Sequence, residues 1–412
     1  MRVVLAAEGT RGDVHPMLAL GERLRAAGHV VRVCTSPDFA EDVQARGLEF
    51  HPVGGSVRDY LTAQAAALHE GPLAVLRESS EYMRQTVTAQ FDAILEGSAG
   101  ADLVVGAGVQ LGASSIAELR GVPYRYVIYC PAMLPSGDHA PPVLEWQSLP
   151  RVVNRVGWWL TIAFMRFGPG RVVDRERRRL GLPPIDDIGR YLMSPRPIVA
   201  VDRELAEAPA DSPLPVEQIP CLHPFEPDEP LPPKLEAFLV AGPPPVYLGF
   251  GSMPDPRPDE TTRQLLDALA RRGTRAVLSR GWAGLGDGPL PDDVFVTDPV
   301  SHAALFPRMA GIVHHGGAGT TATAARAGVP QLLMPHLLDQ FYWARRVQLL
   351  GLGPPALRRR DFSTERLAEA IAELAENELL AERARDLGER LRRRAREHVD
   401  LAALFSDCTP AR

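Results

Sequence analysis

Short apolar runs alternate with stretches of helical character along most of the chain. Residues 3–7 and 30–34 are apolar runs of the length of a buried strand, and residues 8–14 form a predicted loop with two glycines. Helices are predicted at 15–28, with a proline near the start where its missing N–H costs little, and at 39–46. Strands and helices that alternate in this way predict a doubly wound α/β domain with a parallel sheet.

A second alternation of the same kind begins at residue 246, after a stretch dense in prolines and acidic residues. Further strands are predicted at 276–278, 294–296, 311–313 and 331–334. The chain is therefore divided into a first domain at 1–208, a proline-rich linker at 209–244, a second domain at 245–385 and a terminal helix at 386–412. Two similar α/β halves create a cleft between them, which is the usual place for a ligand.

Composition narrows the class of protein. At 412 residues the chain is long enough for two cores of about 200 residues each. A hydrophobic content of 45% and a charged content of 23% are ordinary for a globular protein, and the net charge of −6 argues against nucleic acid as a partner. The four cysteines lie far apart, which predicts free thiols in a reducing cytoplasm. We expect neither a signal peptide nor a membrane-spanning run.

A glycine-rich turn, His-His-Gly-Gly-Ala-Gly-Thr-Thr at 314–321, lies between a predicted strand and a predicted helix. Such a turn presents unpaired backbone N–H groups and the positive end of a helix dipole, which favour an anion and most often a phosphate. The side chains of His315 and Thr320 add further hydrogen-bonding groups. The predicted phosphate site consists of His315, Gly316, Gly317, Ala318, Gly319 and Thr320. The alternative is a tight strand-to-helix turn that binds nothing.

Three further motifs accompany this turn: Leu-Ser-Arg-Gly-Trp at 278–282, Arg-Ala-Gly-Val-Pro at 326–330 and Met-Pro-His-Leu-Leu-Asp-Gln at 334–340. With them the chain resembles the inverting, nucleotide-sugar-dependent glycosyltransferases of the GT-B fold, in the branch that glycosylates natural products and sterols. The resemblance covers nearly the whole chain. It implies two Rossmann-like, doubly wound domains that face a deep cleft, with a C-terminal helix that crosses back to the first domain.

The resemblance also implies a general base. Thr-Arg-Gly-Asp-Val at 10–14 matches the family pattern in which the aspartate is the base, so Asp13 is the candidate. Its predicted loop follows the first strand and lies at the carboxyl end of the sheet, where ligands bind. An aspartate with a pKa of about 3.9 is a weak base unless burial raises that pKa. Some relatives carry histidine at this position, so His15 is a rival base or a partner, and a structural role for Asp13 is the third alternative.

The donor contacts are implied residue by residue. Ser252 would contact the diphosphate, Ser279, Arg280 and Trp282 would surround the nucleobase with Val296 or Thr297, and Asp339 and Gln340 would bind the sugar hydroxyls. The last two residues could instead cap the helix that follows. His29 and His314 are expected to be structural.

Two absences bear on the donor. The chain has no Asp-x-Asp motif, so the resemblance implies that the glycine-rich turn and His315 stabilise the diphosphate without a metal, and we expect no cofactor. Relatives that use UDP-sugars often have a glutamate eight residues after the motif histidine, where it holds both ribose hydroxyls. This chain has Thr323 there, which fits a dTDP-sugar because deoxyribose lacks the 2′-hydroxyl.

Residues 140–168 are rich in aromatic and large apolar side chains. Trp146, Trp158 and Trp159 are the candidate acceptor contacts, as an apolar wall for a bulky molecule. One alternative is a helix packed on the core. Another is weak contact with a membrane surface, which the neighbouring arginines would support.

The sequence thus predicts a cytoplasmic, metal-independent, inverting glycosyltransferase. It would transfer a hexose, glucose before any other, from a dTDP- or UDP-sugar to a hydroxyl of an apolar natural product such as an antibiotic precursor. A nucleotide-sugar epimerase of the same fold and a non-catalytic nucleotide-sugar-binding helper are the alternatives. We expect a monomer or a homodimer, and the sequence does not specify the acceptor.

Overall fold

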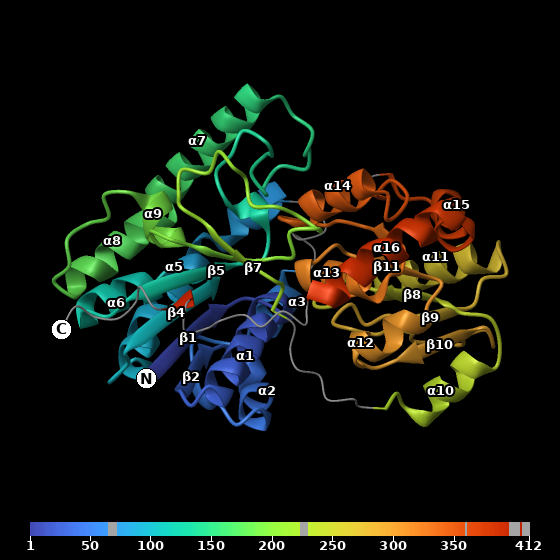
Figure 1. Cartoon of the computed structure of the whole chain (residues 1–412), viewed down its shortest axis with the longest axis horizontal. Helices are drawn as coiled ribbons and strands as arrows, with labels where there is room; N and C mark the ends of the chain where they lie inside the picture. Colours follow the sequence, from blue (N-terminus) through green and yellow to red (C-terminus); the bar gives the residue numbers. More distant parts are fainter. Residues whose placement is uncertain (65–71, 223–229, 359–360, 395–403, 406–412) are drawn as a thin grey trace.

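Two parallel β-sheets, one in each half of the chain, form the framework of the protein (Figure 1). The computed structural model describes residues 1–64, 72–222, 230–358, 361–394 and 404–405. The first sheet has the order β3-β2-β1-β4-β5-β6-β7 and the second the order β10-β9-β8-β11-β12, with parallel pairing between all neighbours. The strands are β1 (Arg2–Glu8), β2 (Val30–Thr35), β3 (Glu49–Pro52), β4 (Leu103–Gly108), β5 (Tyr124–Ile128), β6 (Ile198–Ala200), β7 (Glu217–Ile219), β8 (Val246–Gly249), β9 (Ala276–Ser279), β10 (Val294–Thr297), β11 (Gly311–His314) and β12 (Gln331–Leu333).

Helices cover both faces of the first sheet, because its central strand β1 is apolar at nearly every position. Val3, Leu5 and Ala7 pack in the same core as α1, whereas Val4 and Ala6 pack on the opposite face in the core formed with α5 and α6. The helices of this half are α1 (Arg11–Ala26), α2 (Ala40–Ala45), α3 (Val57–Ala63), α5 (Pro72–Gly97), α6 (Ala113–Arg120), α7 (Arg151–Phe167), α8 (Pro169–Arg179) and α9 (Ile188–Met193). Those of the second half are α10 (Pro233–Val240), α11 (Pro258–Ala270), α12 (His302–Leu305), α13 (Ala318–Ala327), α14 (Gln340–Leu350), α15 (Thr364–Glu376) and α16 (Glu378–Arg394). The predicted doubly wound α/β architecture is confirmed.

The first helix begins earlier than the sequence predicts. Helix α1 starts at Arg11 rather than at residue 15, because Thr10 caps it. The Thr10 hydroxyl accepts the Gly12 N–H at 3.3 Å, and the Asp13 carboxylate accepts the Thr10 N–H at 2.9 Å. This capping box satisfies two backbone donors that the helix itself leaves unpaired. Asp13 therefore lies in the first turn of a helix and not in a loop.

The predicted linker range, 209–244, also contains regular structure. Strand β7 extends the first sheet by pairing with β6, and α10 packs in the core of the second half through Leu235 and Leu239. The connection between the domains is therefore shorter than the proline content indicates. A short strand and a short amphipathic helix are easily hidden when prolines flank them.

The two halves contact each other through a shared apolar cluster. Tyr126, Ile128 and Leu205 of the first half pack with Tyr342 and Trp343 of the second. At its edge the Arg346 guanidinium donates to the Leu205 carbonyl oxygen at 2.9 and 3.1 Å. The shared cluster and these hydrogen bonds therefore join the two halves along one edge of their boundary.

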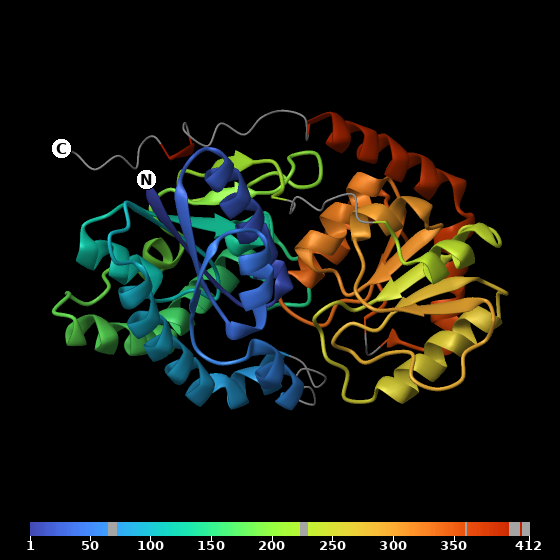
Figure 2. The same cartoon turned by 90° about the horizontal axis from the view of Figure 1, so that it is seen from below.

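The C-terminal part of the chain returns toward the first domain. Helix α16, drawn in dark red in Figure 2, packs along α13, and Arg394 at its end pairs with Glu204 at 3.0 Å. Leu404 and Phe405 are buried in the core of the first domain, where Arg125 donates to the Leu404 carbonyl oxygen at 2.7 Å. The predicted terminal segment is 386–412, and its residues 395–403 and 406–412 lie outside the described part of the chain.

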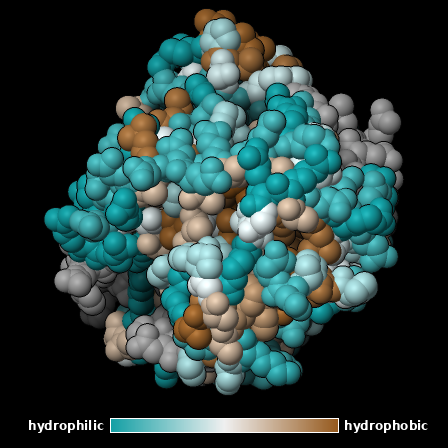
Figure 3. Space-filling model, turned by 90° about the vertical axis from the view of Figure 1, so that its right-hand side faces the viewer, coloured by the Kyte–Doolittle hydropathy of each residue, from teal (hydrophilic) through white to brown (hydrophobic). Residues whose placement is uncertain are grey.

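Helix α7 lies at the top of the first domain in Figure 1, and apolar side chains gather at the same top edge in the space-filling view of Figure 3. Within the part of the chain that the structure describes, no helix is long and apolar enough to cross a membrane. Cys34, Cys130 and Cys221 are free thiols, as predicted, and Cys408 lies outside that part.

Candidate active site

The turns that follow the strands of the second sheet meet at one edge of that sheet. The Trp282 N–H donates to the Gly251 carbonyl oxygen at 2.9 Å, which joins the turns after β9 and β8. The Arg280 N–H donates to the Thr297 carbonyl oxygen at 3.0 Å, which joins the turns after β9 and β10. Because the strands are parallel, their carboxyl ends lie together, and this edge is where open α/β sheets bind ligands.

The glycine-rich turn places the ring of His315 between two glycines. A Cβ on Gly251 would lie 3.0 Å from the imidazole, and one on Gly317 would lie 2.5 Å from it, so a side chain at either position would displace the ring. Gly317 is the N-cap of α13, and a Cβ on Gly319 would meet nothing within 4 Å. The first N–H groups of α13 therefore face open space beside His315, as an anion site requires.

His315 is held as a neutral imidazole. Burial lowers its pKa to about 4, and the nearby His302 lowers it further. Its Nδ1 atom is buried and has no hydrogen-bond partner among the described residues. A neutral ring whose nitrogens are not committed elsewhere can donate one hydrogen bond to an anion.

The neighbouring His314 has a different role. It is fully buried, its Nε2 lies 3.0 Å from Gln331 Oε1, and its Nδ1 accepts the Gly316 N–H at 3.1 Å. Both ring nitrogens are thus used inside the domain, and this histidine fixes the shape of the glycine-rich turn. This matches the expectation that His314 is structural.

The residues predicted around the nucleobase lie on three adjoining turns. Trp282 is half-buried, and Arg58 of α3 lies over its ring, with the guanidinium carbon 5.9 Å from the ring centroid. Arg280 pairs with Asp287 and lies 3.7 Å from Asp298, while Ser279 and Thr297 are buried below 10% exposure. Val296 is half-buried and contacts Gly286. The half-buried Trp282 ring is therefore available to stack on a nucleobase. The first domain reaches the same ring through Arg58.

The loop after β12 carries the predicted sugar contacts. The side chain of Gln340 is turned into its own loop, where Oε1 accepts the N–H groups of His336 at 2.7 Å and Leu337 at 3.1 Å. Asp339 makes no cap hydrogen bond to α14 and instead accepts from the Trp343 indole N–H at 3.2 Å. Leu338, the residue directly before Asp339, has a φ of +52°. Such a strained backbone costs on the order of 1–3 kcal/mol and is typical of ligand sites.

Asp13 is placed at the opposite side of the cleft by α1. Gly9 and Gly108 leave the room for its carboxylate, since a Cβ on Gly9 would lie 2.2 Å from Oδ2 and one on Gly108 would lie 3.1 Å from Oδ1. Oδ2 accepts from the Thr10 N–H, whereas Oδ1 makes no hydrogen bond with any described residue. Burial raises the pKa of Asp13 to about 6 even though Thr10 lowers it. The carboxylate is thus a stronger base than a free aspartate and has one uncommitted oxygen.

The structure brings Asp13 and Asp339 together across the cleft. Burial and the charge of Asp13 together raise the pKa of Asp339 to about 7. The two carboxyl groups therefore titrate as an interacting pair. Helices α1 and α13 are also in contact, so the first domain meets the second beside the glycine-rich turn.

His15 does not join this group. Its Nε2 lies 3.6 Å from the Asp42 carboxylate, and its ring contacts Phe39 edge-on, both in the first domain. Residues two positions apart on a helix point to nearly opposite sides, which separates His15 from Asp13.

Two side chains at the site were not predicted. Glu8, at the end of β1, is 5% exposed, and its Oε2 has no hydrogen-bond partner in the described chain. Burial, then the charges of Asp13 and Asp38, raise its pKa to about 8, so it is neutral at physiological pH. The sequence could have indicated Glu8, because it is a charged residue at the end of an otherwise apolar strand. Nothing in the sequence indicated Arg58, because only the folded chain places α3 against Trp282.

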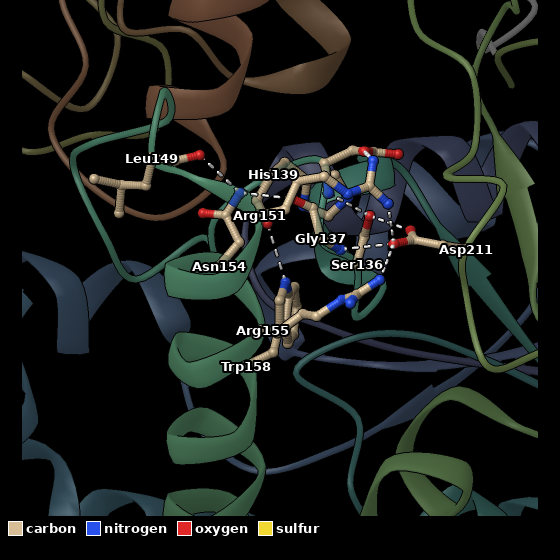
Figure 4. A network of polar contacts seen from close by, with 10 residues as sticks. Ser136, Gly137, His139, Leu149, Arg151, Asn154, Arg155, Trp158 and Asp211 are labelled. Atoms are coloured by element: carbon tan, nitrogen blue, oxygen red, sulfur yellow. Dashed lines mark hydrogen bonds and ion pairs between the residues drawn. The ribbon is translucent and has the colours of Figure 1, made fainter.

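The three tryptophans of the predicted acceptor wall lie in different environments. Trp158 is buried and its indole N–H donates to the His139 carbonyl oxygen at 3.3 Å, whereas Trp146 is 54% and Trp159 68% exposed. Figure 4 shows the polar network beside them, in which Asp211 accepts from the Gly137 N–H at 3.0 Å and from Arg151 at 2.9 Å. A cavity of about 290 Å³ lies here, lined by Pro135, Ser136, Gly137, Arg155, Trp158, Trp159, Ile162, Asp211 and Pro213. A helix packed only on the core therefore does not account for this segment.

No three His, Cys, Asp or Glu side chains within the described ranges are grouped so that they could hold a metal ion. Independence of a metal stays a prediction.

The chain matches two family models. Residues 3–135 match the glycosyltransferase family 28 N-terminal domain, and residues 263–395 match the C-terminal domain of proteins like erythromycin biosynthesis protein CIII. Among curated proteins it is 40% identical over 361 residues to glycosyltransferase GtfE of Amycolatopsis orientalis, covering 86% of this chain and 85% of that protein. It is 39% identical over 363 residues to vancomycin aglycone glucosyltransferase of the same organism, with the same coverage.

A plant protein and two solved structures extend these matches. The chain is 30% identical to sterol 3-beta-glucosyltransferase UGT80B1 of Arabidopsis thaliana over 400 residues, which is 90% of this chain and 62% of that protein. The kitacinnamycin glycotransferase superposes with a TM-score of 0.69 at 22% identity over 99% of both chains. Glycosyltransferase VinC in complex with dTDP superposes with a TM-score of 0.65 at 22% identity over 95% of both chains. The two structures share the arrangement of two parallel-sheet domains.

Proposed function

The chain belongs to the GT-B glycosyltransferases of the antibiotic and sterol branch, and from this premise we propose that it transfers a hexose, with inversion, from a nucleotide sugar to a hydroxyl of an apolar natural product. One observation carries the proposal. Asp13 of the first domain has a raised pKa, and its charge acts on the Asp339 carboxyl of the second domain, where the N-terminus of α13 carries the neutral His315. We assign the base to Asp13, the sugar contact to Asp339 and the anion site to the start of α13.

Asp13 is the base in the proposed reaction. Its free Oδ1 takes the proton of the acceptor hydroxyl as the acceptor oxygen bonds to the anomeric carbon. The bond between that carbon and the diphosphate oxygen breaks on the opposite side, and its electron pair leaves with the diphosphate. Attack from the face opposite the leaving group inverts the anomeric configuration.

The leaving diphosphate is stabilised by the start of α13. Its free N–H groups, the Thr320 hydroxyl and neutral His315 supply hydrogen bonds where negative charge develops, with Ser252 on the adjoining turn. We infer from this set of donors that the reaction needs no divalent metal. Activity should survive excess chelator, and complete loss that magnesium restores would contradict this.

Asp339 and the Gln340 amide are the proposed contacts to the sugar hydroxyls. The Gln340 oxygen is used by its own loop, but its Nε2 donates, among the described residues, to the Met253 sulfur at 3.6 Å, a weak acceptor. A carboxyl and an amide N–H suit adjacent ring hydroxyls, which favours a hexose with intact 3- and 4-hydroxyls and glucose first. The glucosyltransferase names of two relatives are consistent with this choice.

A dTDP-sugar is the proposed donor. Thr323 donates to the Gly319 carbonyl oxygen at 2.8 Å inside α13, so no carboxylate is available there for two ribose hydroxyls. A solved neighbour is described as a complex with dTDP. In competition between dTDP-glucose and UDP-glucose, the dTDP-sugar should be used at least as well, and a strong preference for UDP would contradict the assignment.

The test of the reaction is a product assay with matched blanks. The enzyme is incubated with dTDP-glucose or UDP-glucose and a panel of glycopeptide, polyketide and sterol aglycones, and products are identified by mass and by NMR of the anomeric proton. We expect one added hexose with inverted configuration. Conversion of the donor in the absence of any acceptor would indicate an epimerase instead. Donor binding without turnover on every aglycone would indicate a binding helper.

A further inference from the structure

The outer face of α7 is apolar and exposed over the whole length of the helix. Six large side chains on it are between 52% and 71% exposed: Val152, Val156, Trp159, Leu160, Phe164 and Phe167. We call these residues the α7 stripe. The inner face packs on the domain through the buried Trp158 and Asn154 and the partly buried Ile162 and Met165.

An amphipathic surface helix normally packs its apolar face on the core and turns its polar face to water, whereas the α7 stripe faces outward. Single exposed apolar residues are common at protein surfaces, but a continuous patch of this kind marks an interaction site. At 17 residues α7 is about 25 Å long, and it lies along the top of the first domain (Figure 1). Some partner is needed to remove this surface from water.

The charge next to the stripe indicates which partner. Arg171, Arg175 and Arg178 are exposed on α8, at spacings of four and three residues that place them on one side of the helix. None of the three forms an ion pair with a carboxylate among the described residues, whereas Arg166 pairs with Asp174 at 2.8 Å and Arg177 with Glu118 at 2.8 Å. We call the three free arginines the α8 margin.

The margin and the stripe are continuous. The Arg171 guanidinium lies over the Phe167 ring, 5.6 Å from its centroid, where α7 ends and α8 begins. An apolar helix face with tryptophan and phenylalanine, bordered by unpaired arginines, has the composition of a helix that lies in the plane of a membrane interface. Each basic side chain near an anionic leaflet adds about 1 kcal/mol of attraction.

We propose that the α7 stripe and the α8 margin dock this protein on the surface of an anionic lipid bilayer. The apolar side chains enter the boundary between headgroups and acyl chains, and the arginines contact the phosphates. A second copy of the chain is a poorer occupant, because an antiparallel or parallel pairing of two stripes brings several unpaired arginines near each other without carboxylates to neutralise them.

Docking in this orientation has a consequence that rests on the proposed function. Trp159 belongs to the stripe and also lines the cavity of about 290 Å³ that Trp158 closes from the inside. An apolar acceptor dissolved in the lipid boundary would therefore meet this cavity on leaving the membrane. The binding itself requires neither donor nor acceptor.

The experiment measures sedimentation of the full chain with vesicles of phosphatidylcholine alone and of phosphatidylcholine mixed with phosphatidylglycerol. We expect binding to the mixed vesicles, weaker binding at high salt, and little binding to phosphatidylcholine alone. The Phe164→Ser/Phe167→Ser variant should bind at least tenfold more weakly. The Arg171→Gln/Arg175→Gln/Arg178→Gln variant should bind the mixed vesicles as weakly as the wild type binds neutral ones.

Control variants make matching changes elsewhere. Leu349→Ser/Leu379→Ser alters two exposed leucines of the second domain, and Arg383→Gln/Arg385→Gln/Arg390→Gln alters three exposed arginines on α16; both should bind as the wild type does. Thermal unfolding of each variant shows that it is folded. Absence of binding to mixed vesicles would overturn the proposal. So would a dimer in analytical ultracentrifugation that the Phe164→Ser/Phe167→Ser variant abolishes, because the stripe would then be covered by a second copy. Either result leaves the proposed reaction untouched, since the product assay contains no lipid.

Discussion

The two walls of the cleft are built from different materials. The donor wall, formed by the turns of Ser252, Trp282 and His315, uses backbone N–H groups, glycines and a neutral imidazole. The base wall, formed around Glu8 and Asp13, uses buried carboxyl groups whose pKa values are raised to about 8 and about 6. The donor wall is therefore insensitive to pH near neutrality, whereas the base wall titrates there.

The difference matches what each wall does in the proposed reaction. A diphosphate needs fixed dipoles, which rigid turns provide at little cost on reaction. A general base needs a pKa near the working pH, and that requires burial of a carboxylate, which destabilises the charged form. The base wall thus trades stability for reactivity, and the donor wall does not.

Replacing the general base, Asp13, should have the largest effect on activity. Asp13→Asn should lower turnover about a hundredfold or more, because the acceptor proton then has no base, while dTDP affinity should hardly change. His15→Ala, with its side chain against Asp42, should lose less than about threefold. Turnover measured at saturating donor, with dTDP binding by calorimetry, checks both variants. Near-normal turnover of Asp13→Asn would show that Asp13 only caps α1.

The Asp13→Asn variant should be more stable than the wild type above about pH 6. Burial raises the pKa of Asp13 to about 6, above the usual aspartate value of about 3.9, so folding disfavours the charged form, and stability is lost as the pH rises through the folded-state pKa. The melting temperature of Asp13→Asn should therefore exceed that of the wild type above pH 6, and the gap should shrink toward pH 4. A gap independent of pH would mean that the carboxylate is not held at a cost.

The pH dependence of catalysis separates the two carboxyls. We expect kcat/KM to fall about tenfold for each pH unit below about 6, where Asp13 takes up a proton. If Asp13 is the base, the Asp339→Asn variant should keep an acid limb near pH 6, because the titrating carboxyl is still present. A limb that moves or disappears in Asp339→Asn would assign the titration to the sugar contact instead.

On the donor wall, His315→Ala should weaken dTDP binding and turnover together. A hydrogen bond to a charged group contributes about 1.5–3 kcal/mol, which corresponds to about tenfold to a hundredfold in affinity. Wild-type affinity of His315→Ala, measured by calorimetry, would place the diphosphate away from the glycine-rich turn.

Asp339→Ala tests the sugar contact at the junction of the walls. Turnover with dTDP-glucose should fall at least about tenfold, since the sugar hydroxyls lose a buried partner, while dTDP affinity should stay within about threefold. A donor that lacks the 3- or 4-hydroxyl should lose little further activity in this variant. If the affinity for dTDP fell as much as turnover does, Asp339 would instead support the structure of its loop.

The smallest expected effect concerns the contact between Arg58 and Trp282, which links the two domains at the predicted nucleobase site. Arg58→Ala should weaken dTDP binding about two- to fivefold, in keeping with about 0.5–1 kcal/mol for an exposed cation–π contact. Arg390→Ala, an equal charge change on α16, should have no effect. If Arg58→Ala binds dTDP as tightly as the wild type does, the first domain does not close over the base.

The donor wall could be predicted from sequence because its parts are local. Gly316, Gly317 and Gly319 are needed where the backbone must approach a ligand, and their order between a strand and a helix fixes the direction of the N–H groups. The alternation of strands and helices likewise determined both sheets. Helix α1 and strand β7 were misplaced because a capping threonine and a three-residue strand give weak local patterns.

Other features arose only from long-range contacts. The raised pKa values of Glu8 and Asp13 come from burial among segments far apart in the chain, and Arg58 reaches Trp282 only because the domains meet. The sequence of α7 shows where its apolar residues lie, but periodicity alone cannot tell an apolar face that is buried from one that is exposed. The face of a helix that is exposed to water depends on which face the rest of the protein packs against. That packing is a property of the tertiary structure.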